Sequence, residues 1–398
     1  MIPYGLHYID KSDIKNVLKA LKSDFITQGP LVEKFEKKIC KIVKVKYAVA
    51  VSSCTAGLHI ALKSIINRNK NKDKDKVLTS PISFASTANI VKLNNLKLDF
   101  VDINKDSLNI SSRELEKKIK KNKNILSVIP VHLSGYAAHS KEIYRLCKKN
   151  NIFVIEDAAH SFGAKYEKKY RVGSCKYSDL TVFSFHPVKT LTTGEGGVIT
   201  TNSKNLYRKL LILRNHGIEK NSKNWQNKRY GFSKNQPNLW YYEMQNLGFN
   251  YRITDFQCAL GLSQMQKLNI ILKKRKKIAK IYDEHFRSIK NLFIPQMFKR
   301  ELSSNHLYIL NIDFKKIKIS RNFFMKELKK NKIITQVHYI PIPLHPYYNK
   351  RGFNMKSLKN SDNYYQQALS IPIFFKLNAS AQLRVINSIK KMLLKFSK

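Results

Sequence analysis

One lysine of this chain stands where a side-chain amine could do covalent chemistry. Lys189 follows an apolar, β-prone run, 180–185, that carries Ser184, and Gly194-Glu-Gly-Gly197 then leads into a second strand-like run, 198–201. Most lysines are solvated surface charges, but here the flanks suggest an amine that projects from packed apolar segments. Desolvation lowers the pKa of an amine, and an unprotonated amine can form a Schiff base. We therefore predict an imine-forming lysine held between two strands.

A carboxylate with an unusual position comes about thirty residues earlier in the chain. Asp157 comes just after the apolar run 152–155 and should emerge at the C-terminal edge of a buried strand. An ionised carboxylate at such a place is costly unless it has a partner. Two interpretations fit this pattern, a partner supplied by a bound group or the N-cap of a following helix.

A third segment could hold a phosphate. The short β-prone run 47–51 is followed by the small residues Ser52-Ser-Cys-Thr-Ala-Gly57 and by a helical pattern over 58–66. This order presents free backbone N–H groups and a helix dipole to an anion, although small residues at a helix start also serve as simple caps. Phe84 follows another strand end, where it could pack in the core or line a site.

Together these segments resemble the DegT/DnrJ/EryC1/StrS family of sugar aminotransferases, in which Ser-Phe-x-x-x-Lys followed by Gly-Glu-Gly-Gly recurs. The similarity runs almost from end to end. The resemblance implies pyridoxal phosphate as cofactor, bound to Lys189, with its pyridine nitrogen protonated opposite Asp157 so that the ring acts as an electron sink. The cofactor-binding residues that it implies are Cys54, Thr55, Ala56, Phe84, Asp157, His160, Ser184, Lys189 and, from a neighbouring subunit, Asn250.

The resemblance also implies a reaction and partners. Within the family it is closest to enzymes that move the amino group of L-glutamate to C4 of a UDP-linked 4-keto-6-deoxy-N-acetylhexosamine for pseudaminic acid synthesis, as homodimers with shared sites. The substrate-binding positions that it implies are Tyr4, Asp24, Phe25, Ile26, Thr27, Asn305, His306, Leu307, Tyr308 and His338. An aminotransferase for another nucleotide 4-keto or 3-keto sugar remains an alternative, and His160 and His338 could instead be structural. Dehydratase relatives replace the lysine, so Lys189 argues against that activity.

The order of elements predicts an α/β protein of aminotransferase fold type I. Strand patterns alternate with helix patterns up to residue 201, as in a mainly parallel sheet flanked by helices. We expect a large cofactor-binding domain over 1–253 and, over 254–398, bridging helices and a small α+β domain. An amphipathic helix over 254–268, a bridging helix over 269–286 and strands at 303–310 and 334–341 are predicted there, and 215–248 is predicted to be a long loop.

Charge and cysteine content bound the remaining function classes. The chain has 398 residues and a formal charge of +47, which would suit a nucleic-acid-binding protein, but the lysines are spread throughout and no basic arm stands out. Compositional bias explains the charge better, so we expect no nucleic-acid and no membrane partner. Five scattered cysteines without Cys-x-x-Cys spacing argue against disulfides and against a metal site. Without a signal peptide pattern, we expect a cytoplasmic protein.

Overall fold

The protein has an α/β fold built on one large sheet, as predicted. The computed structural model describes residues 1–66, 73–137 and 139–396. A seven-stranded sheet runs in the order β1-β7-β6-β5-β4-β2-β3, and only β7 is antiparallel to its neighbours. Its strands are β1 (Tyr47–Val51), β2 (Lys76–Thr79), β3 (Lys97–Phe100), β4 (Ile125–Ile129), β5 (Phe153–Asp157), β6 (Leu180–Ser184) and β7 (Gly197–Thr201).

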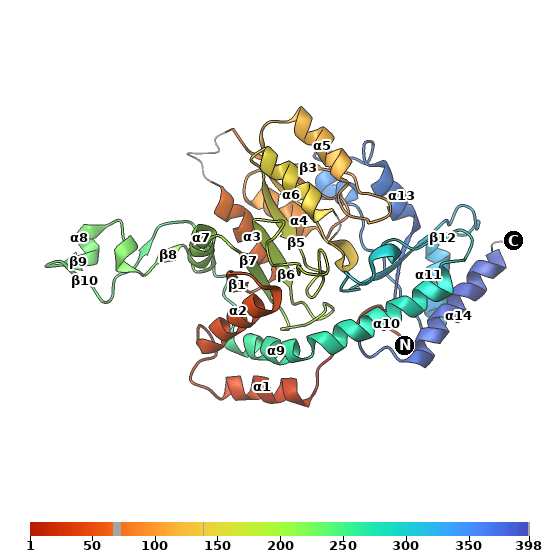
Figure 1. The fold of residues 1–398 in the computed structure, drawn as a ribbon, viewed down its shortest axis with the longest axis horizontal. Coiled ribbons are helices and arrows are strands. Elements are labelled where there is room, and N and C mark those ends of the chain that lie inside the picture. Colours follow the sequence, from red (N-terminus) through yellow and green to blue (C-terminus); the bar gives the residue numbers. More distant parts are fainter. Residues whose placement is uncertain (67–72, 138, 397–398) are drawn as a thin grey trace.

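Helices cover both faces of this sheet because its strands are apolar on both sides (Figure 1). On β6, Val182 packs into the cluster under one set of helices, and the next residue, Phe183, packs into the opposite cluster. The first set is α3 (Cys54–Ile65), α4 (Ser86–Leu93) and α7 (Lys204–Arg214). The second set is α2 (Pro30–Val43), α5 (Ser112–Lys121), α6 (Ser140–Lys149) and α9 (Asp255–Gln266).

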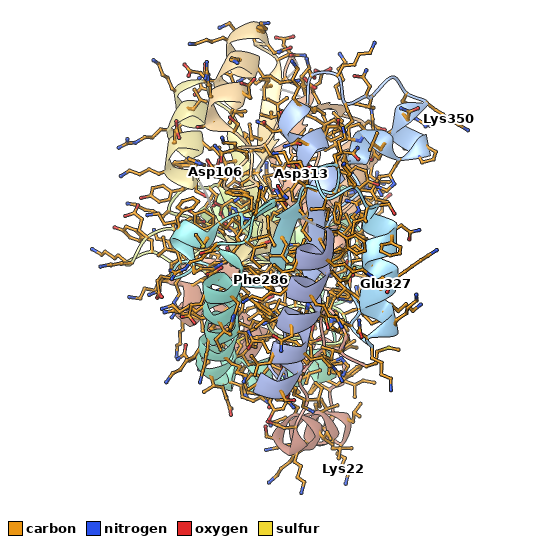
Figure 2. The ribbon with its side chains drawn as sticks, turned by 90° about the vertical axis from the view of Figure 1, so that its right-hand side faces the viewer. Lys22, Asp106, Phe286, Asp313, Glu327 and Lys350 are labelled. Atoms are coloured by element: carbon orange, nitrogen blue, oxygen red, sulfur yellow. The ribbon has the colours of Figure 1, made fainter. Side chains whose placement is uncertain are left out.

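A second, smaller sheet lies on the right of Figure 1. It is antiparallel, in the order β12-β13-β14. Phe286, labelled in Figure 2, lies on helix α10 and packs in an apolar cluster that also contains residues of helix α14. The first residues of the chain join this part, since Ile2 pairs with Ile333. The domain boundary at 253/254 stays a prediction. The elements here are α10 (Leu268–Phe286), β12 (Leu292–Phe293), β13 (Tyr308–Ile312), α11 (Arg321–Lys330), α12 (Pro346–Asn349), α13 (Lys359–Gln367), β14 (Ala368–Ile371) and α14 (Ala379–Phe396).

Two predicted strands of the small domain are corrected. The strand expected over 303–310 begins only at Tyr308, because the N–H groups of Ser304 and His306 donate to the carbonyls of Gly135 and Ser134 instead of to a ladder. The strand expected over 334–341 does not form. In the described residues its backbone pairs through a single bridge between Gln336 and Ser370, and the Ile334 N–H donates to the Ile2 carbonyl at 2.9 Å. Both segments leave the sheet and cross to the loops of the large domain.

The helix predicted over 254–268 forms as α9, with a capping box in which Thr254 accepts from the Gln257 N–H. The expectation that it is amphipathic is wrong, because α9 is buried between α1 (Lys11–Leu21) and α2. Asp13 of α1 is fully buried at this contact, where it accepts from Gln264 at 2.7 Å and pairs with Lys267.

The segment 215–248 projects from the body as an arm, at the left of Figure 1. It holds two short strand pairs and one short helix, and so is mostly the irregular segment that was predicted. Leu239, Trp240 and Met244 expose most of their surface on it. Its elements are β8 (Ile218–Glu219), α8 (Lys228–Gly231), β9 (Phe232–Ser233), β10 (Gln236–Pro237) and β11 (Glu243–Met244).

The buried charge of Asp13 makes the docking of α1 testable. Replacing Asp13 by Ala should lower the free energy of unfolding by about 2 kcal/mol, because the buried Gln264 amide loses an acceptor and Lys267 keeps only the Asp10 carboxylate, at 2.9 Å. Urea denaturation measures this change. The control is Glu33→Ala, which removes an exposed ion pair with Lys37 and should leave the midpoint unchanged. Equal effects of the two substitutions would contradict the assignment.

Candidate active site

The predicted site residues meet in a cavity of about 420 Å³ at the C-terminal ends of the parallel strands. Contributions come from the strand ends and loops of the large sheet, from the segments that carry His306 and His338, and from Tyr4 of the N-terminal segment. The predicted residues that line it are Tyr4, Cys54, Thr55, Phe84, Asp157, His160, Ser184, Lys189, His306 and His338. Most of the predicted cofactor site therefore lies in one place.

Lys189 occupies the turn between β6 and β7, where its backbone N–H donates to the His186 carbonyl at 2.9 Å. Burial of the side chain lowers the pKa of its amine to about 8, and the nearby Cys54 and Asp157 offset only part of this effect. A substantial fraction of the amine is then neutral near pH 8. The prediction of a desolvated lysine agrees with this environment.

Asp157 ends β5 with its carboxylate buried against the cavity. The Thr87 hydroxyl donates to Oδ2 at 2.6 Å, and the Ala159 N–H donates to Oδ1 at 3.1 Å. Every hydrogen-bond donor to this carboxylate in the described residues is therefore uncharged. Because a buried charge needs compensation, this carboxylate suits a cationic group in the cavity, such as a protonated ring nitrogen.

The first turn of α3 meets the cavity beside Lys189. Ser53 caps the helix by accepting from the Ala56 N–H at 3.0 Å, so Ala56 is buried behind the cap and does not line the cavity. The N–H groups of Cys54 and Thr55, which do line it, have no acceptor within the helix. Gly197 permits this approach, since a Cβ there would lie 2.7 Å from the Ser53 carbonyl carbon. The turn can therefore receive an anion such as a phosphate.

A stack of three rings forms one wall of the cavity. The His160 ring lies between His306, at 4.4 Å between centroids, and Tyr339, at 6.0 Å, and the Tyr339 hydroxyl is 2.9 Å from His160 Nε2. Burial lowers the pKa of both His160 and His306 well below the ordinary value, with a further contribution from the Lys189 charge. Burial likewise lowers the pKa of His338 to about 3. All three imidazoles are therefore neutral at physiological pH.

Sequence reasoning missed several residues of this site, among them Thr87, which contacts Asp157, and Tyr339. Thr87 sits one helical turn after Ser83, whose hydroxyl it contacts at 2.7 Å, within a segment that reads as an ordinary helix start. Tyr339 directly follows His338 and was hidden by the expectation of a regular strand. The adjacent Phe84 ring, 6.1 Å from Tyr339, was predicted.

Several predicted substrate residues lie away from the cavity. The side chains of Leu307 and Tyr308 pack in apolar clusters, and Asn305 donates to the carbonyls of Arg300 and Ser303. Of the four residues of the segment 305–308, His306 alone lines the cavity. Their substrate contacts stay predictions.

A second group of predicted residues gathers on another surface. The segment Asp24–Thr27 connects α1 to α2, with Phe25 and Ile26 exposed, and Thr27 pairs with Thr254. Asn250 is also exposed, at the base of the arm, where it pairs with Asn215. None of these residues lines the cavity of its own chain.

Two absences concern the described residues alone. Within them, no helix is long and apolar enough to span a bilayer. No group of three or more His, Cys, Asp and Glu side chains in the same residues could hold a metal ion, although five histidines line the cavity.

Comparison with known proteins gives consistent matches over the whole chain. Residues 7–390 match the model of the DegT/DnrJ/EryC1/StrS aminotransferase family. The uncharacterized protein MJ1066 of Methanocaldococcus jannaschii is 39% identical over 96% of this chain and 95% of its own length. UDP-4-amino-4,6-dideoxy-N-acetyl-beta-L-altrosamine transaminase of Campylobacter jejuni is 37% identical over 95% and 94%. Among solved structures, Helicobacter pylori PseC, an aminotransferase of pseudaminic acid biosynthesis, superposes with a TM-score of 0.89 at 30% identity, covering 99% of this chain and 100% of that one.

The lowered pKa of Lys189 predicts selective reactivity. In cofactor-free protein, acetylation of Lys189 by trace acetic anhydride should reach half its maximal rate near pH 8, since only the neutral amine reacts. Quantitative mass spectrometry of the Lys189 peptide measures this dependence. A lysine in an unstructured peptide, with a pKa of about 10.4, is the reference, and a Lys189 curve that coincides with it would contradict the desolvated environment.

Proposed function

Because this chain belongs to the DegT/DnrJ/EryC1/StrS aminotransferase family, we propose that it moves the amino group of L-glutamate to C4 of a UDP-linked 4-keto-6-deoxy-N-acetylhexosamine. The substrate of the proposal is UDP-2-acetamido-2,6-dideoxy-β-L-arabino-hexos-4-ulose, and the product is UDP-4-amino-4,6-dideoxy-N-acetyl-β-L-altrosamine, on the route to pseudaminic acid. The family is one of pyridoxal-phosphate-dependent sugar aminotransferases, so the reaction class and the cofactor follow from membership. The choice of sugar is supported by the 37% identity to the Campylobacter jejuni transaminase.

The observation that carries the proposal is that one cavity holds both a desolvated lysine and a buried carboxylate with only uncharged donors. These residues fit pyridoxal phosphate, with Asp157 opposite the pyridine nitrogen, and with the α3 N-terminus and Ser184 around the phosphate. When bound, the cofactor provides a carbonyl carbon for the Lys189 amine and a ring that withdraws electrons from the reacting carbon.

The part of the chemistry that the protein side chains perform is proton transfer in this cavity. The neutral Lys189 amine is the base that takes the proton from Cα of glutamate, and as an ammonium it returns a proton during amination of the sugar. The pKa of about 8 keeps both forms accessible near neutral pH. Asp157 is held in place by its two donors, and the neutral imidazoles of His160, His306 and His338 offer hydrogen bonds without repelling a cationic amine.

The positions of the remaining predicted residues favour a homodimer with shared sites. Asn250 and Asp24–Thr27 lie outside the cavity of their own chain, so we propose that a second copy places Asn250 at the phosphate of this one. The arm supports this proposal, because its exposed apolar side chains include Leu239, Trp240 and Met244, and large exposed apolar surfaces mark contacts with other proteins.

Two other functions make different predictions. An aminotransferase for another nucleotide keto sugar would keep every feature of the cavity and differ only in the accepted sugar. A nucleic-acid-binding protein needs a gathered basic surface, whereas nitrogen-tipped side chains project from all sides of the molecule in Figure 2. Neither the charge distribution nor the cavity favours nucleic acid.

The visible absorbance of the bound cofactor tests the proposed reaction. L-Glutamate alone should remove the band above about 400 nm, and the UDP-4-keto sugar should then restore it, because each half-reaction changes the bonding at the cofactor. Lys189→Ala should complete neither change, since the amine that moves the proton is gone. If the wild type responds to glutamate but only another keto sugar restores the band, the sugar assignment is wrong. If added pyridoxal phosphate gives no band, the catalytic proposal fails.

Shared sites predict complementation between inactive variants. Lys189→Ala and Asn250→Ala should each lose most activity as homodimers, through loss of the base and of a phosphate contact. After mixing under conditions of subunit exchange, each heterodimer would contain one intact site, so activity should recover to about a quarter of the wild type. Steady-state rates measure the recovery. Failure to recover, with heterodimers verified by mass spectrometry, would place Asn250 in its own subunit's site.

A further inference from the structure

Arg275 of α10 is among the most completely buried large side chains of the protein, with 2% of its surface exposed. Its Nη1 donates to the carbonyls of His306 at 3.1 Å, Ile373 at 3.1 Å and Asn305 at 3.4 Å. All of its acceptors in the described residues are therefore backbone carbonyls. Burial lowers the pKa of Arg275 to about 10, so the guanidinium remains charged at neutral pH.

One other buried arginine, Arg300, and the partly buried Arg214 have a different environment. Arg214 pairs with Glu36 at 2.7 Å, and Arg300 pairs with Asp283 at 2.9 Å. A buried cation that has only neutral partners costs more free energy than a paired one. An arginine in the place of Arg275 therefore calls for a reason beyond stability.

The carbonyls that Arg275 holds belong to two segments of the cavity wall. One segment carries His306, which lines the cavity. The other contains Ile373, whose N–H donates to the Tyr4 carbonyl at 3.1 Å, and the Tyr4 ring lies 5.3 Å from His338 on the same wall. One guanidinium thus connects both segments to α10.

The charge of Arg275 also acts on the reacting part of the cavity. Arg275 and Lys189 border a common void of about 10 Å³, which is room for about one water molecule. The groups that act on His306 are His160, Lys189, Arg275 and His338, and all of them favour its neutral form, as burial does. An uncompensated positive charge behind this wall favours an anionic ligand in front of it.

We propose that Arg275 is a positioning residue of the candidate site, which holds the segments of Tyr4 and His306 in place for an anionic nucleotide sugar and adds a positive charge behind them. The inference rests on the proposed function for the identity of the ligand. It assigns Arg275 no contact with substrate or cofactor.

Steady-state kinetics of three variants of the holoenzyme test this role. Arg275→Gln should raise KM for the UDP-4-keto sugar about tenfold, which corresponds to ~1.4 kcal/mol, with kcat and the KM for glutamate changed less than about threefold. Arg275→Lys keeps the charge and should recover most of the KM, although an ammonium cannot reproduce the fork of a guanidinium. Tyr282→Phe is the matched control, because Tyr282 lies on α10 and donates to the neighbouring Pro372 carbonyl without a charge.

Tyr282→Phe should leave KM for the sugar nucleotide within about twofold of the wild type, because it removes one neutral hydrogen bond. Equal changes in Arg275→Gln and Tyr282→Phe would overturn the proposal, as would a loss of kcat with KM unchanged. If Arg275→Gln does not fold, Arg275→Lys decides: a KM for the sugar nucleotide raised more than in Tyr282→Phe supports the positioning role, because an ammonium cannot reproduce the fork of a guanidinium, and a KM equal to that of Tyr282→Phe overturns it.

Hydrogen exchange separates this inference from the proposed function. In unliganded full-length protein, Arg275→Gln should increase amide exchange at His306 and Ile373, whereas Arg275→Lys should do so less and Tyr282→Phe should leave His306 unchanged. Unchanged exchange in Arg275→Gln would overturn the positioning role whatever the substrate. If the variants show these differences in exchange but the wild type does not aminate the sugar, the positioning role stands and the proposed function is refuted.

Discussion

Removing the Lys189 amine from water is the constraint on which the arrangement of this protein depends. An amine on a flexible stem stays protonated in solvent, and burial between β6 and β7 lowers its pKa to about 8. The antiparallel β7 strand returns the chain beside β6, and Gly197 lets the α3 N-terminus approach the same turn. The amine, the Asp157 carboxylate and a set of free N–H groups thereby meet at one edge of the sheet.

The second requirement is that charge in this cavity be balanced by what the cavity binds. Among the residues that the structure describes, Asp157 accepts hydrogen bonds only from uncharged donors and Arg275 donates only to backbone carbonyls. Both side chains are buried, Asp157 at the cavity and Arg275 behind its wall. A cationic ligand near the first and an anionic ligand in front of the second would each recover part of the desolvation cost. A cationic ring and an anionic nucleotide sugar satisfy the two demands together, which is consistent with the aminotransferase family.

Local patterns were sufficient to predict the centre of the site but not its wall. Lys189, Asp157 and the α3 turn each sit at a strand end, and a strand end can be recognised from a few neighbouring residues. Tyr339 and Thr87 act through partners that lie far away in the chain, such as His160 and Asp157, and no short pattern reports such contacts. The strand expected over 334–341 failed for the same reason, since the groups that pair with its backbone, the Ile2 carbonyl and Ser370 of β14, lie far away in the chain. Asn250 and Asp24–Thr27 could be recognised by resemblance, but one chain alone does not bring them to the cavity.

The decisive measurement is borohydride reduction of the purified holoprotein, followed by peptide mapping. Reduction fixes a Schiff base as a stable secondary amine, so the mass of the pyridoxyl group marks whichever lysine carried the cofactor. We expect the label on the peptide that contains Lys189, in stoichiometric amount, despite the many competing lysines among the 74 Lys and Arg residues. Label spread over several exposed lysines, or concentrated on another one, would contradict the assignment of Lys189 as the residue around which the cavity is built.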